Sequence, residues 1–183
     1  MSTGAGVVLV EGISDQRALE ALAGRRGRDL DAEGVSVVPI GGAQSIGRVL
    51  AHYGPHGLDL RLAGLCDAGE EGDFRRGLER AGLGSVLTRG DLERLGFYVC
   101  VADLEDELVR ALGAGAVQQI IEAQGELDRF RTYQRQLAHR GRTHESQLWG
   151  FMHNRKIRYA PLLVAALDLS RVPRPLDRVL AHV

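Results

Sequence analysis

The chain has 183 residues, 44% of them hydrophobic and 26% charged, which is typical of one globular domain with or without a small appendage. This composition excludes a disordered protein, a fibre and a disulfide scaffold. The longest apolar run, 162–167, is far shorter than the roughly 20 residues that cross a bilayer, and we find no secretory signal. Cys66 and Cys100 lack a CxxC partner, so we expect reduced core residues of a cytoplasmic protein.

Charge is distributed unevenly along the chain. Residues 1–107 carry 18 acidic and 11 basic residues, whereas residues 108–183 carry 6 acidic and 12 basic residues. This asymmetry predicts an acidic site joined to a surface that binds anions, and scattered solvated charge is the alternative. Lys156 is the only lysine among 23 basic residues. It indicates a site that needs a compact ammonium group, unless it is there by chance.

Strand and helix patterns alternate in the first half of the chain. We predict strands at 7–10, 35–40, 60–66 and 97–102, and helices at 14–23, 44–53, 71–81 and from 106. Later segments read as helices only, at 115–124, 127–140, 144–153, 157–168 and 175–182. The sequence therefore predicts an α/β fold, with a mostly parallel four-stranded sheet flanked by helices in residues 1–113. An all-helical C-terminal extension follows in residues 114–183.

Carboxylates follow three of the four predicted strands. Glu11 follows the first strand, Asp67 the third, and Asp103 and Glu105 the fourth. The carboxyl ends of parallel strands meet at one edge of a sheet, where such groups repel one another unless a cation binds. Oxygen ligands without Cys or His favour Mg²⁺ or Mn²⁺. The alternative is that acids such as Asp15 merely stabilise helix N-termini.

Four segments, taken in order, resemble one known family. They are Val8–Asp15 (VLVEGISD), Leu65–Asp67, Asp103–Leu108 (DLEDEL) and Asn154–Ala160 (NRKIRYA), the last of which contains Lys156. Together they resemble the motifs of the TOPRIM domain in nucleases of the OLD (overcoming lysogenisation defect) family. The resemblance covers nearly the whole chain. It implies a Rossmann-like TOPRIM fold and a metal-dependent endonuclease that hydrolyses DNA phosphodiester bonds with one or two Mg²⁺ or Mn²⁺ ions.

The resemblance also implies roles for individual residues. Lys156 would stabilise charge on the scissile phosphate or on the leaving group. The second acid of the family's Asp-x-Asp motif is missing, since the sequence reads Asp67-Ala68-Gly69. The implied catalytic residues are Glu11, Asp67, Glu105 and Lys156. The implied metal ligands are Glu11, Asp15, Asp67, Asp103 and Glu105, with Glu70, Glu71 or Asp73 as candidates to replace the missing acid.

Arginines are frequent in the helical extension and are interleaved with Phe130 and Tyr133. This mixture suits phosphate contacts and base stacking. The alternative is an exposed helix that packs Phe130, Tyr133 and Leu137 inward. The predicted nucleic-acid-binding residues are Arg129, Arg131, Arg135, Arg140, Arg142, Arg155 and Arg158.

Other functions stay open at this point. The missing acid favours a catalytically degenerate TOPRIM module that binds nucleic acid or a separate ATPase. The sequence does not contain the ATPase domain of OLD proteins, so we expect a standalone OLD-like TOPRIM protein. An RNA-maturation nuclease of the TOPRIM type ranks below a DNA nuclease, since no RNA-reading module is recognisable. The resemblance implies a role in phage defence or DNA repair. A homo-oligomer is compatible with the sequence, and no membrane partner is expected.

Overall fold

The computed structural model describes residues 5–183 and contains one four-stranded sheet whose neighbouring strands all run parallel. The strands are β1 (Gly6–Val10), β2 (Val35–Pro39), β3 (Arg61–Asp67) and β4 (Phe97–Cys100), in the order β2-β1-β3-β4 across the sheet. β1 lies in the middle and is buried along its whole length. The predicted α/β fold with a parallel sheet is therefore confirmed.

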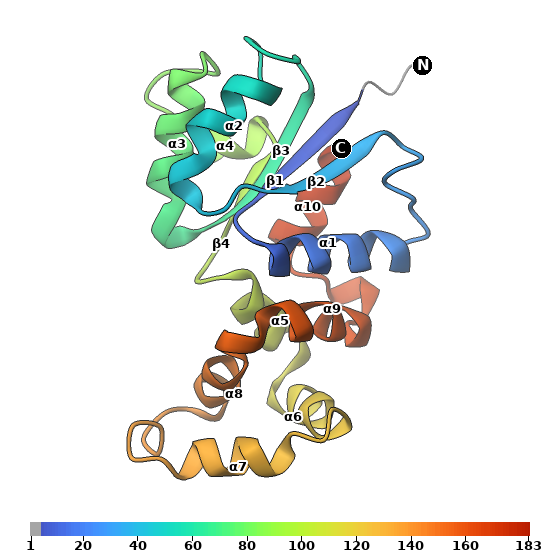
Figure 1. Cartoon of the computed structure of the whole chain (residues 1–183), viewed down its shortest axis with the longest axis vertical. Helices are drawn as coiled ribbons and strands as arrows, with labels where there is room; N and C mark the ends of the chain where they lie inside the picture. The colour runs from blue at the N-terminus through green and yellow to red at the C-terminus, as the bar shows by residue number, and fades with distance from the viewer. Residues whose placement is uncertain (1–4) are drawn as a thin grey trace.

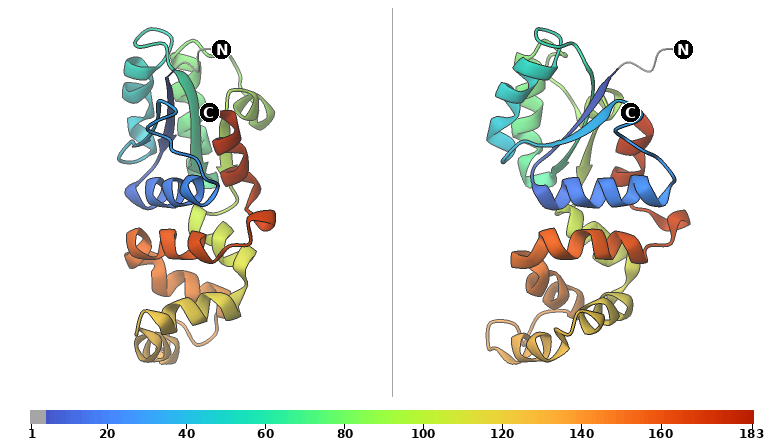
Figure 2. Two further views of the ribbon diagram at one scale, coloured as in Figure 1. Left: turned by 90° about the vertical axis from the view of Figure 1, so that its right-hand side faces the viewer. Right: turned by 45° about the vertical axis from the view of Figure 1, so that its right-hand side comes forward.

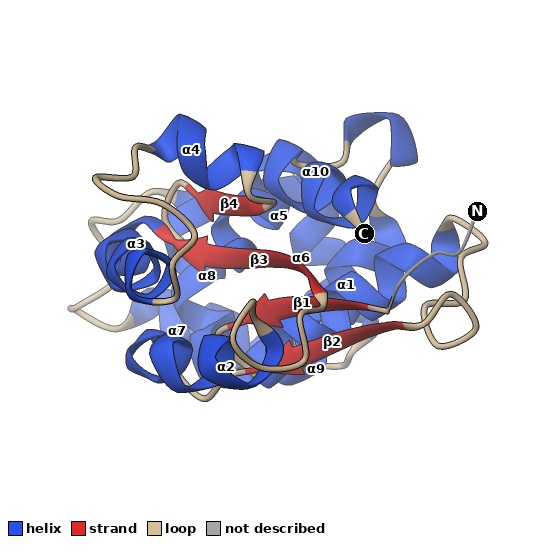
Figure 3. Ribbon diagram, turned by 90° about the horizontal axis from the view of Figure 1, so that it is seen from above, coloured by secondary structure: helices blue, strands red, loops and turns tan. Residues whose placement is uncertain are grey.

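Helices cover both faces of the sheet (Figure 3). Side chains alternate along a strand, so Val8 packs on one face of β1 and Leu9 on the other. The face with Val8 is covered by α1 (Ile13–Arg25) and α10 (Arg174–His182), and the face with Leu9 by α2 (Ile46–Tyr53), α3 (Glu71–Arg80) and α4 (Arg89–Arg94). Short 3₁₀ turns lie at Ala43–Ser45, Ala68–Glu70, His153–Arg155 and Leu169–Arg171.

A layer of helices lies beyond the C-terminal edge of the sheet (Figure 1). It consists of α5 (Leu104–Leu112), α6 (Ala114–Ala123), α7 (Leu127–Arg135), α8 (His144–Met152) and α9 (Lys156–Ala166). α9 lies alongside α1, and α10 then returns to β3 and β4 (Figure 2). The hydrophobic core thus continues from Val8 through Phe130 to Val183. The predicted domain boundary at 113 coincides with Gly113, which joins α5 to α6 at a φ of 80°, but the division into two domains stays a prediction.

Two elements differ from the sequence-based expectation. Helix α4 was not predicted, although Thr88 and Asp91 form a capping box at its start. The helix expected over 127–140 ends at Arg135, where the chain turns so that His139 stacks on Tyr133 with ring centroids 3.8 Å apart. Leu137 is left 86% exposed by this turn. Across residues 5–183, no helix is both long enough and apolar enough to cross a membrane.

Gly64 generates a prediction about packing at the centre of the sheet. A Cβ at this position would lie 2.7 Å from Phe97 Cδ1 and 2.9 Å from the Leu9 carbonyl oxygen. We expect Gly64→Ala to lower the free energy of unfolding by about 1–3 kcal/mol in urea titrations followed by circular dichroism. The control is Gly47→Ala in α2, where a Cβ meets nothing within 4 Å; it should stabilise by about 0.5–1 kcal/mol. Equal effects of the two substitutions would contradict this packing.

Candidate functional site

The acidic residues predicted from the sequence gather at the C-terminal edge of the sheet. Glu11 directly follows β1, and its Oε1 accepts a hydrogen bond of 2.8 Å from the backbone N–H of Asp67, the last residue of β3. Asp103 follows β4 and caps α5, since its Oδ1 accepts from the backbone N–H of Asp106. Glu105 lies in the first turn of α5 and is only 2% exposed. The parallel arrangement of the strands is what brings these residues together.

Lys156 connects the helical layer to this acidic edge. Its Nζ lies 2.8 Å from Asp103 Oδ2 and 2.9 Å from Glu105 Oε2. Lys156 is the first residue of α9, where the helix dipole disfavours a cation, so the two carboxylates account for its position. Burial alone would lower the pKa of Lys156, but Glu105 and Asp103 outweigh this effect and raise it, so the ammonium is charged at neutral pH.

Trp149 is a member of the site that sequence reasoning missed. Its indole Nε1–H points at the Asp103 carboxylate, 2.9 Å from Oδ1 and 3.0 Å from Oδ2. Burial would raise the pKa of Asp103, but the hydrogen bonds from Lys156, the Asp106 backbone and Trp149 together lower it. The only signal in the sequence was that Trp149 is the single tryptophan of the chain.

Of the three acids that follow Gly69 in the sequence, Glu70 is the one that lies beside Glu11. The 3₁₀ turn at Ala68–Glu70 returns Glu70 to Glu11, and burial together with this neighbouring carboxylate raises the pKa of Glu11 to about 9. The other two candidates are engaged elsewhere: Glu71 pairs with Arg75 and Arg89, and Asp73 pairs with Arg76. Glu70 is thus the acid after Asp67 that reaches the site.

Burial also raises the pKa values of Asp67 and Asp15. For Asp67 the pKa is about 7, through burial and then the nearby charges of Asp103 and Asp15. For Asp15 it is about 6, through burial and then the charge of Glu105. Asp15 also accepts a hydrogen bond of 2.9 Å from the backbone N–H of Gly12, so it caps α1 as well as facing the cluster. The pKa values of Asp15, Asp67 and Glu11 are therefore all raised, as expected for carboxylates that are buried close to one another.

The donor set fits a hard divalent cation, although its side chains are not arranged around one. Across residues 5–183, no three His, Cys, Asp or Glu side chains are placed to hold one ion as they stand. Lys156 fills the space between Asp103 and Glu105, so their side chains must shift before an ion can bind. All donors are oxygens, and two buried carboxylate oxygens, Glu70 Oε2 and Glu105 Oε1, have no hydrogen-bond partner. A cation bound beside either oxygen would give that oxygen a partner.

The predicted nucleic-acid-binding arginines divide into two groups. Arg129, Arg155 and Arg158 lie near Glu126 at a groove that also contains Lys156. The others do not line this groove. Arg131 lies beside Asp128, and Arg140 donates to the Arg135 carbonyl. Arg135 and Arg142 are exposed on α7 and on the turn that follows it.

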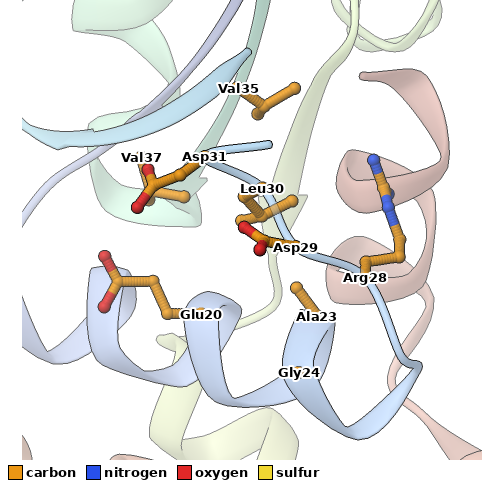
Figure 4. Close-up of a pocket in the computed structure, with 9 residues that line it drawn as sticks. All are labelled: Glu20, Ala23, Gly24, Arg28, Asp29, Leu30, Asp31, Val35 and Val37. Atoms are coloured by element: carbon orange, nitrogen blue, oxygen red, sulfur yellow. The ribbon is translucent and has the colours of Figure 1, made fainter. Parts of the chain in front are cut away.

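A separate cavity of about 450 Å³ lies at the other end of α1, against β2 (Figure 4). Its wall contains three acids, Glu20, Asp29 and Asp31. Arg28, the basic residue in this wall, is bound by Glu33 and by the carbonyl oxygens of Leu180 and Val183. Arg28 is therefore not free to bind a ligand. None of the predicted site residues lines the cavity.

The pairing of Lys156 with two buried carboxylates predicts a large effect on stability. We expect Lys156→Met to lower the free energy of unfolding by about 3–5 kcal/mol in EDTA, because Asp103 and Glu105 would be left as unpaired buried charges. Arg110→Met is the control, since Arg110 is 48% exposed and should contribute about 0–1 kcal/mol. Urea titrations measure both. Similar small losses in the two variants would show that Lys156 does not neutralise this site.

The raised pKa values predict how stability depends on pH. Asp15, Asp67 and Glu11 bind protons more tightly in the folded protein than in the unfolded chain, whose carboxyls titrate near pH 4. The stability that these three protonated groups contribute to the folded state is fully present below about pH 4. It is lost as pH rises through their folded-state pKa values of about 6, 7 and 9. In EDTA the wild-type Tm should therefore decrease as the pH is raised from about 5.5 to about 8.5, and the Tm of Asp67→Asn should decrease less. A wild-type Tm that rises over this interval would contradict the assignment.

Comparisons with known proteins agree with this architecture. Residues 4–68 match the family model described as the TOPRIM domain of overcoming lysogenization defect protein-like proteins. No curated protein matches the sequence. The C-terminal region of the Xanthomonas campestris pv. campestris OLD protein superposes with a TM-score of 0.75 at 23% identity, covering 98% of this chain and 92% of that one. The C-terminal region of the Burkholderia pseudomallei OLD protein superposes with a TM-score of 0.72 at 19% identity, covering 98% of this chain and 96% of that one. Residues 4–68 are therefore similar to the OLD-like TOPRIM domain, and the chain as a whole has the TOPRIM fold of the C-terminal regions of OLD proteins.

Proposed function

We propose that the chain is a nuclease that hydrolyses DNA phosphodiester bonds with Mg²⁺ or Mn²⁺ bound at the carboxylate edge of the sheet. The observation that carries this proposal is the placement of the half-buried, charged Lys156 among the carboxylates that follow three parallel strands. TOPRIM domains generally use divalent metal ions, and the TOPRIM nuclease family acts on nucleic acid. Under this proposal one chain would supply both the carboxylates that bind the cation and an ammonium group next to them.

Two groups of carboxylates would hold the metal. Glu11, Asp67 and Glu70 lie at the ends of β1 and β3, and Glu70 supplies the acid that Gly69 lacks. The second group, from α1 and α5, is Asp15, Asp103 and Glu105. A bound divalent ion activates water and stabilises the oxygen that leaves the phosphorus.

The protein contributes mainly charge and position. Lys156 would place its ammonium beside the scissile phosphate or the leaving oxygen, and Trp149 would hold Asp103 in place. We extend the proposal to a separate ATPase partner and to a role in phage defence or DNA repair, both of which follow from the resemblance to OLD proteins.

Plasmid cleavage tests this function. We expect nicking or cutting with Mg²⁺ or Mn²⁺ and none in EDTA, and a loss of at least about 10²-fold in Glu11→Gln and in Asp67→Asn. Asp106→Asn is the matched control, because this carboxylate is on the same edge but pairs with Arg110 at the surface. Folding of each variant is checked by its Tm. Cleavage that persists in EDTA, or in both acidic variants, would refute the proposed site.

A second function, DNA binding without cleavage, is favoured by two observations. Gly69 replaces an acid of the motif, and no three ligands are prearranged for an ion among the described residues. Stable DNA binding without cleavage under either metal would establish this second function and exclude the first.

A further inference from the structure

An open groove of about 920 Å³ lies next to the acidic site, with which it shares Lys156, and its wall includes residues of the helical layer. It runs between the start of α1, with Ile13 and Ser14, and the start of α9, with Lys156 in its wall. Glu126 and Arg129, at the start of α7, also line it. A molecule lying in this groove would therefore reach the proposed reaction site at one end.

Three arginines of the groove share one buried carboxylate. Glu126 is 4% exposed, and its oxygens lie 3.3 Å from Arg129 Nη1, 3.7 Å from Arg155 Nε and 3.6 Å from Arg158 Nη1. The Tyr159 hydroxyl donates to the same carboxylate, and this bond, with the arginine charges, lowers the pKa of Glu126. One negative charge thus faces three positive ones, which leaves a net positive charge at the groove.

The guanidinium groups are held but still accessible. Arg155 lies 4.6 Å over the Phe151 ring and donates to the Phe151 carbonyl at 2.9 Å, while Arg158 donates to Gln124 at 3.0 Å. The side chains of Arg129, Arg155 and Arg158 are 74%, 37% and 50% exposed. Because they are already positioned, binding a phosphate costs little side-chain entropy.

The groove also offers apolar and aromatic surface to a ligand. Ile13 and Ile157 are 47% and 55% exposed on its two sides. The exposed His153 ring lines the groove next to Trp149, with ring centroids 5.2 Å apart. In a duplex the faces of the bases are covered by stacking on one another. Apolar and aromatic side chains can therefore contact base faces only where the bases are unpaired.

We infer that this groove binds a single strand of DNA, with its phosphates on Arg129, Arg155 and Arg158 and its bases against Ile13, His153 and Ile157. The inference rests on the proposed function for its direction, because Lys156 would then lie where the strand enters the reaction site. The arginines favour a phosphate backbone, and the apolar and aromatic side chains favour unstacked bases, so together they favour single-stranded DNA.

Binding without metal tests this inference independently of cleavage. A fluorescein-labelled oligo-dT and a hairpin duplex are titrated by anisotropy in EDTA at several salt concentrations. We expect the single strand to bind more tightly, and Arg129→Gln/Arg158→Gln to weaken its binding by about tenfold or more. The slope of log K against log salt should fall by about 1.4, since each lost phosphate contact to a single strand contributes roughly 0.7.

Arg131→Gln/Arg135→Gln is the matched control, because it removes two exposed charges from α7 outside the groove. It should leave the salt slope unchanged, and the Tm of each variant shows that the fold is intact. Tighter duplex binding by the wild type would overturn the single-strand assignment, and equal losses in both double variants would overturn the groove. Asp67→Asn separates the two proposals, since it should bind the oligonucleotide at least as tightly as the wild type and not cleave. A wild-type protein that binds in this pattern but never cuts would refute the nuclease alone.

Discussion

Repulsion between carboxylates is the constraint on which the arrangement of this molecule depends. Parallel strands place Glu11, Asp67 and Asp103 at one edge, and Glu105 is buried beside them. Buried like charges are unfavourable without a partner, and the ammonium of Lys156 supplies one. The ion pairs cross from α9 to α5 and fix the start of α9 at the sheet edge. The same contacts position part of the groove, because Lys156 lies in its wall.

The sequence was sufficient for features that depend on periodicity and on strand ends. Four apolar runs separated by helical patterns predicted the parallel sheet, and a shared edge followed for Glu11, Asp67 and Asp103. Local signals were less decisive. The capping box at Thr88 marked α4 but stood without a clear helical pattern, and the polar pattern after Arg135 did not show that His139 would stack on Tyr133.

Tertiary contacts explain what could not be predicted. Glu70 reaches Glu11 because of a 3₁₀ turn, whereas Asp73, which lies three residues further along the chain, pairs with Arg76 on α3. Trp149 joins the site through a contact with Asp103 across 46 positions, which no local spacing encodes. The arginines of α7 were grouped by closeness in sequence, but only Arg129 among them turns to Glu126 and the groove. Burial and side-chain direction decided each of these cases.

The uneven charge of the two halves of the chain acquires a spatial meaning here. Acidic side chains gather at the sheet edge and arginines at the groove of the helical layer, and Lys156 lies where the two regions meet. A DNA phosphate drawn toward Lys156 also approaches ionised carboxylates, which repel it. A cation at those carboxylates would remove that repulsion, and a bound phosphate would in turn favour the cation. Under the proposed function, metal and DNA binding are therefore thermodynamically linked, and each strengthens the other by the same factor.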